Sequence, residues 1–341
     1  MSEELYVPKI RRGPKWWNTK PMRRFRRNPL GIIGMIILAL FLLMALFAPQ
    51  MTTTQLGKYK SNCTRDLGLS KLEARQILNP TKFVFWRSMI YPPGSCYKIP
   101  RASYSEIPTA PNEYSPLGTS NGYDIFYGLV WGTRLALLVG IVVTGLGVFF
   151  GIIIGSIAGY FGGLVDTIIM KFIEIIFAIP PLIFSMIIIS ILGQSLRSIL
   201  IALSIFSWTG YARFIRGEIL GVRQNDFVDA ARGLGAGNIR IMFKHILPNV
   251  ISNVLIIASL QIGTVVLSVA GLSFLGLGPA VGTADWGQMV SFARSWVTGL
   301  PGQPFLYWYV LFWPGLTIVL FALSWNLLGD AIRDVLDVRS H

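Results

Sequence analysis

The sequence predicts an all-α integral membrane protein with six transmembrane helices. The first observation behind this prediction is composition: 53% of the 341 residues are hydrophobic and only 13% are charged, whereas a soluble chain carries about 25% charged residues. The second observation is the length of the apolar runs. Residues 28–57 and 135–165 contain no charged side chain, and a helix needs only about 20 apolar residues to cross a bilayer.

These runs should be helices, because inside lipid the backbone must satisfy its own hydrogen bonds. One of the expected spans carries Arg213 and Arg216 at its end, where long basic side chains can reach the interface. A large soluble helical protein is the alternative, and the low charge content disfavours it. We expect the spans at 30–49, 131–159, 167–192, 198–217, 250–274 and 307–330.

The placement of the basic residues predicts the orientation. Of the Lys and Arg side chains, nine lie in residues 9–27 and six between Arg213 and Lys244, while Arg333 and Arg339 follow the last span. Six spans put these regions on one side of the membrane, which the positive-inside rule identifies as cytoplasmic. Topology is therefore the main explanation of the net charge of +14, with contact to anionic membrane lipid as a second role of the N-terminal basic run, so nucleic-acid binding is not expected.

The resulting organisation has five parts. The first apolar run is too long for the core of a cleaved signal peptide, so we interpret it as a retained span. We expect a basic cytoplasmic segment at 1–29, the first helix at 30–49, an external insertion at 50–130, a transmembrane core at 131–335 with short cytoplasmic helices at 226–249, and a cytoplasmic tail at 336–341.

The external insertion contains both cysteines of the chain, Cys63 and Cys96. Disulfides persist outside the cytoplasm, so we predict a Cys63–Cys96 bridge that closes a small external subdomain. Two free thiols are the alternative, because a pair of cysteines determines the partner but not the geometry.

Two expected spans have features that favour close packing or bending. Gly151 and Gly155 form a GxxxG step, which lets membrane helices approach closely; the neighbour could be a partner subunit or the same chain. The prolines at 180–181 should bend the span 167–192. In the same span, Lys171 and Glu174 are spaced to pair on one helix face, and we favour a structural pair over a functional one.

A polar segment, Asp226–Asn249, interrupts the apolar runs on the predicted cytoplasmic side. Asp226 can cap a first short helix, and glycines within 233–237 should interrupt it. Asn238 can cap a second helix, which Pro248 would end. We expect two short helices joined by a glycine elbow that a partner protein can approach, with a plain loop as the alternative.

Several stretches of this sequence together resemble the permease subunits of peptide-type ABC importers, the dipeptide/oligopeptide/nickel group. The similarity covers roughly residues 20–341 and is weakest over 50–110. The matching stretches are Asn28-Pro29-Leu30-Gly31, Pro116-Leu117-Gly118-Thr119, Gly132-Thr133-Arg134, Ala178–Pro181, Tyr211-Ala212-Arg213, the segment from Ala230 to Asn249, Leu272–Gly278 and Asn326–Asp330.

The resemblance implies a transport subunit rather than an enzyme. It implies a second homologous permease, two cytoplasmic ATPase subunits that bind ATP and Mg, and an extracytoplasmic substrate-binding protein, in a bacterial or archaeal cytoplasmic membrane. This chain has no phosphate-binding loop of its own, and His245 and His341 lie apart from any Cys/His cluster, so we expect it to bind no cofactor or metal. The residues implied in ATPase coupling are Asp229, Ala230, Ala231, Gly235, His245, Leu247 and Pro248.

The chain departs from the family pattern at Asp229, where Glu is usual, and at Ser115, Ser120 and Tyr123 on the external side. We expect ATP-driven uptake of peptides or similar solutes by alternating access. An ion-gradient-driven transporter or an intramembrane hydrolase would need ionisable or catalytic groups within the spans, and these are scarce. The substrate stays open among dipeptides, oligopeptides, nickel and sugars.

Overall fold

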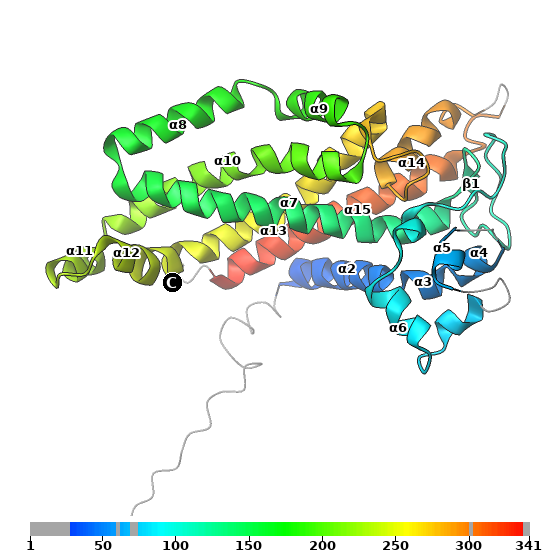
Figure 1. The fold of residues 1–341 in the computed structure, drawn as a ribbon, viewed down its shortest axis with the longest axis horizontal. Coiled ribbons are helices and arrows are strands. Elements are labelled where there is room, and N and C mark those ends of the chain that lie inside the picture. The colour runs from blue at the N-terminus through cyan, green and yellow to red at the C-terminus, as the bar shows by residue number, and fades with distance from the viewer. Residues whose placement is uncertain (1–27, 59–61, 69–73, 300–302, 337–341) are drawn as a thin grey trace, which may run out of the picture.

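The chain forms a bundle of long helices with a small subdomain at one end (Figure 1). The computed structural model describes residues 28–58, 62–68, 74–299 and 303–336, so almost all of the predicted segments 1–29 and 336–341 lie outside the described residues. In the described part, five helices are long and apolar enough to cross a membrane, and a bent helix pair supplies a sixth candidate. The prediction of an all-α multi-span protein is confirmed.

The helices of the bundle match the predicted spans, with some shifts at their ends. The longest helix, α7, has 37 residues, which corresponds to about 55 Å at 1.5 Å per residue. It begins at Ile125, before the predicted start at 131, and it is longer than a bilayer core is thick. The bundle helices are α2 (Pro29–Leu46), α7 (Ile125–Phe161), α8 (Gly163–Phe177), α9 (Pro181–Leu192), α10 (Leu196–Arg223), α13 (Leu247–Leu272) and α15 (Trp308–Leu336).

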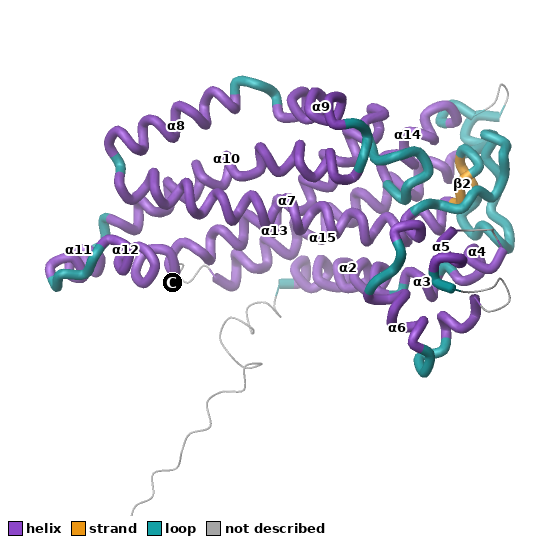
Figure 2. The backbone as a smooth tube through the Cα atoms, viewed as in Figure 1, coloured by secondary structure: helices purple, strands orange, loops and turns teal. Residues whose placement is uncertain are grey.

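Short elements gather at one end of the bundle, which we call the disulfide end (Figure 2). A two-residue antiparallel pair, β1 (Thr119–Ser120) with β2 (Tyr123–Asp124), leads directly into α7. The rest of the insertion consists of short helices and loops in the residues that the structure describes. The short helices that precede this pair are α3 (Ala48–Met51), α4 (Thr53–Lys58), α5 (Asn62–Asp66), η2 (Ala74–Leu78), α6 (Phe83–Ile90) and η3 (Gly94–Tyr97). Later parts of the chain add η5 (Ser273–Leu277), α14 (Trp286–Ala293) and η6 (Arg294–Trp296).

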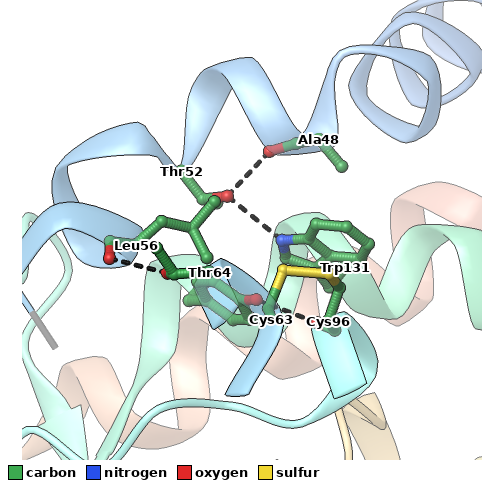
Figure 3. The surroundings of a disulfide bond; sticks show 8 residues. Ala48, Thr52, Leu56, Cys63, Thr64, Cys96 and Trp131 are labelled. Carbon is green, nitrogen blue, oxygen red and sulfur yellow. Dashed lines mark hydrogen bonds between the residues drawn. A yellow bond between two sulfur atoms is a disulfide. The ribbon is translucent and has the colours of Figure 1, made fainter. Parts of the chain in front are cut away.

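The Cys63–Cys96 disulfide is present and fully buried, and it joins α5 to η3 (Figure 3). Around it, Trp131 of α7 donates its indole N–H to the hydroxyl of Thr52 at 3.1 Å. That hydroxyl donates in turn to the carbonyl of Ala48 at 2.8 Å. The bridge and these bonds anchor the insertion on the first turns of α7.

Two buried carboxylates begin helices at the disulfide end. Asp124 accepts a hydrogen bond from the backbone N–H of Tyr127 at 2.7 Å, and Asp285 accepts one from the N–H of Gln288 at 2.7 Å. Both are N-cap residues, of α7 and α14 respectively. Burial nevertheless dominates and raises the pKa of each carboxyl to about 6.

The raised pKa of Asp124 predicts that mild acid stabilises the folded protein. Between pH 4 and pH 6 the folded chain binds more protons at Asp124 than the unfolded chain does, so this contribution to stability falls as the pH rises through that window. We expect the thermal midpoint in detergent to drop between pH 5 and pH 7.5. The Asp124→Asn variant keeps a cap acceptor and should show a smaller drop; an unchanged pH dependence would contradict the assignment.

A stripe of glycines on α7 lies against α10 of the same chain. A Cβ added at Gly155 would lie 2.6 Å from the carbonyl oxygen of Ala212, and one added at Gly151 would collide with Tyr211. Small residues let two helix backbones approach closely. The structure thus answers the question that the GxxxG step left open: its neighbour is within the chain.

The predicted bend divides the third span into two helices. The axes of α8 and α9 differ by 75°, and the break falls next to Pro180 and Pro181. The expected Lys171–Glu174 pair is absent: no ion pair joins these side chains, which are both exposed in the described structure. Arg216 of α10 instead binds Asp166 of α8 with two hydrogen bonds, one of them 2.6 Å long.

Candidate functional site

The predicted polar segment forms the end of the bundle opposite the disulfide (Figure 1). It consists of α11 (Asp226–Gly233), α12 (Asn238–Ile241) and a π-helical turn, η4 (Met242–Ile246), which leads into α13. Two short helical arms joined by an elbow are therefore present, as the sequence predicted. The plain-loop alternative is wrong.

The elbow is a glycine-dependent helix stop. Gly235 has a φ of 81°, a left-handed conformation that glycine adopts without steric cost. The N–H of Ala236 donates to the carbonyl of Ala231 at 3.1 Å, and the N–H of Gly235 donates to the carbonyl of Arg232 at 3.0 Å. This is the Schellman arrangement, which satisfies the last carbonyls of α11 and turns the chain sharply.

Three details of the predicted helix ends are wrong. Asn225, not Asp226, holds the cap position of α11, and it makes no side-chain cap bond. Gly237 precedes α12, while Asn238 accepts a bond from the hydroxyl of Tyr160. Pro248 does not end the second arm, because helical structure continues from α12 through the π turn η4 into α13, which ends at Leu272. Proline is tolerated there because it follows the π turn, within the first turn of α13.

One face of the polar segment packs onto the bundle. Val228, Ile241 and Ile246 are fully buried, and they cluster with Ile215 and Ile219 of α10. Ala231 belongs to the same cluster and is 8% exposed. Its side chain therefore points toward the bundle, unlike that of a residue presented to a partner.

The other predicted coupling residues are more accessible, but they do not form one surface. Asp229, Ala230 and Gly235 are exposed around α11 and its elbow. Asp229 binds Arg232 at 2.9 Å, one turn further along the helix. His245 and Leu247 are half-buried and Pro248 is exposed, all three on the stem that joins the segment to α13.

The structure adds large apolar side chains that the sequence analysis missed. Leu234 is 89% exposed, Ile239 77% and Phe243 66%, at the elbow, α12 and η4. The presence of large apolar residues in a polar segment was the only sign of this surface in the sequence. Whether their side chains point into solvent depends on how α11 and α12 pack against the bundle. We call Phe227, Leu234, Ile239 and Phe243 the apolar tip.

Hydrogen bonds brace the polar segment against the bundle. Arg223, at the end of α10, donates to the carbonyl of Tyr160 at 2.7 Å. The hydroxyl of Tyr160, at the end of α7, donates to Asn238 at 2.9 Å. The ends of α7, α10 and α12 are thereby linked by side-chain hydrogen bonds.

A cleft of about 830 Å³ with a mixed polar and apolar lining lies beside the segment, between α10, α13 and α15. Inside it, Asn253 donates to the carboxylate of Glu218 at 2.5 Å, and Arg333 contributes to the lining. The cleft also reaches Asn225 and Phe227, so it adjoins the start of α11.

Long apolar helices with a braced polar segment at one end are the features expected of a membrane permease subunit. The comparisons with known proteins agree: residues 151–340 match the family of binding-protein-dependent transport system inner membrane components, and residues 17–66 match the N-terminal transmembrane domain of oligopeptide transport permease C. The chain belongs to this family of ABC importer permeases. It is a transport component rather than an enzyme, which sets aside the ion-gradient-driven and hydrolase alternatives.

Two relatives with curated names are similar over most of their length. The dipeptide transport system permease protein DppC of Alkalihalophilus pseudofirmus is 33% identical over 318 residues, which cover 93% of this chain and 88% of that protein. The glutathione transport system permease protein GsiD of Shigella flexneri is 40% identical over 220 residues, which cover 64% of this chain and 70% of that protein.

A solved structure has the same fold. A chain in an inward-facing structure of the MetNI methionine ABC transporter aligns with a TM-score of 0.51 and 20% identity, over 62% of this chain and 97% of that one. As an ABC importer permease, the chain works with ATPase and substrate-binding components.

Proposed function

We propose that this permease takes up di- or oligopeptides, or similar solutes, and that its apolar tip docks a cytoplasmic ATPase. The apolar tip carries the proposal: large side chains stand exposed on a braced segment outside the spanning helices. Large exposed apolar patches mark interaction sites. The peptide substrate is supported by relatives named for dipeptide and glutathione transport.

Basic side chains support a cytoplasmic position for the polar segment. Arg232, Arg240 and Lys244 are exposed on it, and positive charge marks the cytoplasmic side of membrane proteins. The disulfide end then faces outward, where a bridge between cysteines persists. Both termini are cytoplasmic in this orientation, in a bacterial or archaeal cytoplasmic membrane.

A second homologous permease completes the transmembrane unit in this proposal. Lys171 and Glu174 are exposed on α8, within a span, and unpaired ionisable groups are costly in lipid. The face that carries them is therefore suited to another protein or to a water-filled path. The bend between α8 and α9 gives this face a shape that a straight helix lacks.

The proposed mechanism begins at the polar segment, where the ATPases act on the permease. Two partner ATPases bind ATP and Mg, and their closure moves the polar segments of the two permeases. In this chain, the bonds from Tyr160 and Arg223 pass that movement to α7 and α10. The two permeases then open toward the outside, where a substrate-binding protein delivers the solute.

A substitution at Gly235 tests the proposed docking of the ATPase at the elbow. We expect Gly235→Trp to lose ATPase co-purification and transport while it still inserts in the membrane, because a bulky side chain would project from a left-handed residue at the elbow. Gly235→Asn is the matched control, since Asn tolerates that conformation, and it should retain most ATPase binding. Normal ATPase capture and transport by Gly235→Trp would refute docking at this elbow.

A further inference from the structure

Helix α6 exposes an apolar face that the proposed function does not use. Phe83 is 78% exposed, Trp86 49% and Ile90 67%, and Tyr91 directly after the helix is 84% exposed. Positions 83, 86 and 90 share one side of a helix. The opposite side is anchored, because Ser88 is fully buried and Val84 packs against the main hydrophobic core.

The last turn of α6 is held beside the end of a spanning helix. Arg134 of α7 donates hydrogen bonds to the carbonyl oxygens of Ala45 and Leu46, in the last turn of α2, and to that of Met89 in α6. One side chain thus fixes α6 at the level where α2 ends. In Figure 1, α6 lies next to that end of α2, on the flank of the molecule along which α2 runs.

The exposed side of α2 is apolar along its length, as a lipid-facing surface should be. Leu30 is 58% exposed, Leu40 60% and Leu43 51%, and α2 is long and apolar enough to cross a membrane. A bilayer that covers this side ends near Ala45 and Leu46. The exposed face of α6 begins at that level, so it continues the apolar side of α2.

The chemistry of α6 matches a membrane interface. Trp and Tyr are enriched at the boundary between lipid and water, and Trp86 and Tyr91 are both exposed here. Lys82 and Arg87 are exposed beside them. Their long side chains can place a positive charge among lipid phosphates while their stems stay in apolar surroundings.

We propose that α6 lies in the bilayer interface and inserts Phe83, Trp86 and Ile90 into the leaflet next to the end of α2. The occupant of this face is lipid, since the face is continuous with the apolar side of α2 and carries basic charge. Helices with such a face lie in the plane of the interface. The disulfide subdomain is then attached to the membrane surface as well as to α7, which limits its tilt relative to the bundle.

Site-directed spin labelling can test this placement in the importer purified with its partner subunits and reconstituted in phospholipid nanodiscs. Single cysteines at Phe83→Cys and Ile90→Cys receive the label, and the native cysteines stay oxidised in their bridge. Tyr104→Cys is the matched control, because Tyr104 is 93% exposed in a loop of the same subdomain. Leu40→Cys serves as the comparison within a span. Collisions with oxygen, which concentrates in lipid, are compared with those of a water-soluble nickel chelate.

We expect the oxygen-to-nickel collision ratio at 83 and 90 to exceed that at 104 several-fold and to approach that at 40. A ratio at 83 and 90 equal to that at 104 would show that this face lies in water and would overturn the proposal. Protection from both reagents would also overturn it, because a protein partner would then cover α6. The labelled variants should elute and transport like the parent, since all the labelled side chains are exposed.

Discussion

The Gly151→Leu variant should fail to accumulate as a folded protein. A Cβ at position 151 already collides with Tyr211, and it would lie 3.2 Å from the backbone nitrogen of Ala212. A leucine adds three more carbons to a contact whose neighbour is backbone, so α7 and α10 must separate. Overpacking of a well-packed site typically costs about 1–3 kcal/mol, and more where the neighbour cannot move.

The effect should be large because α7 and α10 are the most extensively packed helix pair in the described structure. Their separation would also loosen Tyr160 and Arg223, which brace the polar segment. The measurement is the yield of monodisperse protein after detergent extraction, with thermal midpoints for whatever folds. Gly145→Leu is the matched control, because nothing lies within 4 Å of a Cβ on that exposed glycine of the same helix. Equal yields from the two variants would show that the α7–α10 contact is not close.

The second large effect is expected at the apolar tip. Ile239→Asp should abolish capture of the ATPase subunits and uptake of peptide, while the permease itself stays folded. Ile239 is 77% exposed, so the substitution removes little packing from the chain. In a docked complex the same side chain would be enclosed, and a carboxylate buried there without a partner is costly. Truncation of a hot-spot residue at the centre of an interface costs about 2 kcal/mol or more of binding free energy, which is roughly a 30-fold loss of affinity.

Arg240→Ala is the matched control, since it changes the net charge by the same amount at the neighbouring exposed position. It should weaken ATPase binding only slightly, as substitutions at the rim of an interface do. Ile239→Leu should bind like the parent chain. The measurement is the amount of ATPase co-purified per permease at increasing salt. Wild-type capture by Ile239→Asp would place the ATPase contact elsewhere on the molecule.

Local features of the sequence were sufficient for much of the fold. The spans follow from uncharged runs, the bend in 167–192 from Pro180 and Pro181, and the elbow at Gly235 from glycine's conformational freedom. Each of these depends on residues close together in the chain. The pairing of Cys63 with Cys96 could also be predicted, because the chain contains no other cysteine.

The features that the sequence did not predict depend on contacts between residues that are far apart in the chain or on adjoining turns. Lys171 and Glu174 have the spacing of a pair, yet the ion pair of this region joins Asp166 to Arg216, which are 50 residues apart. Pro248 looked like a helix end, but the preceding π turn η4 leads without a break into α13, which ends at Leu272. Neither outcome could be derived from local patterns, because each depends on the register of a neighbouring turn or helix.

By itself, the sequence determined the class of this protein: a multi-span permease with a polar segment between its apolar runs. Only the tertiary structure decided which residues that segment presents. Ala231 packs against α10, whereas Leu234, Ile239 and Phe243 point outward. The physical reason is that a helix buries the side that best fills the space against its neighbours. The rotation of α11 and α12 is therefore set by Ile215 and Ile219 of α10 and by Tyr160 at the end of α7.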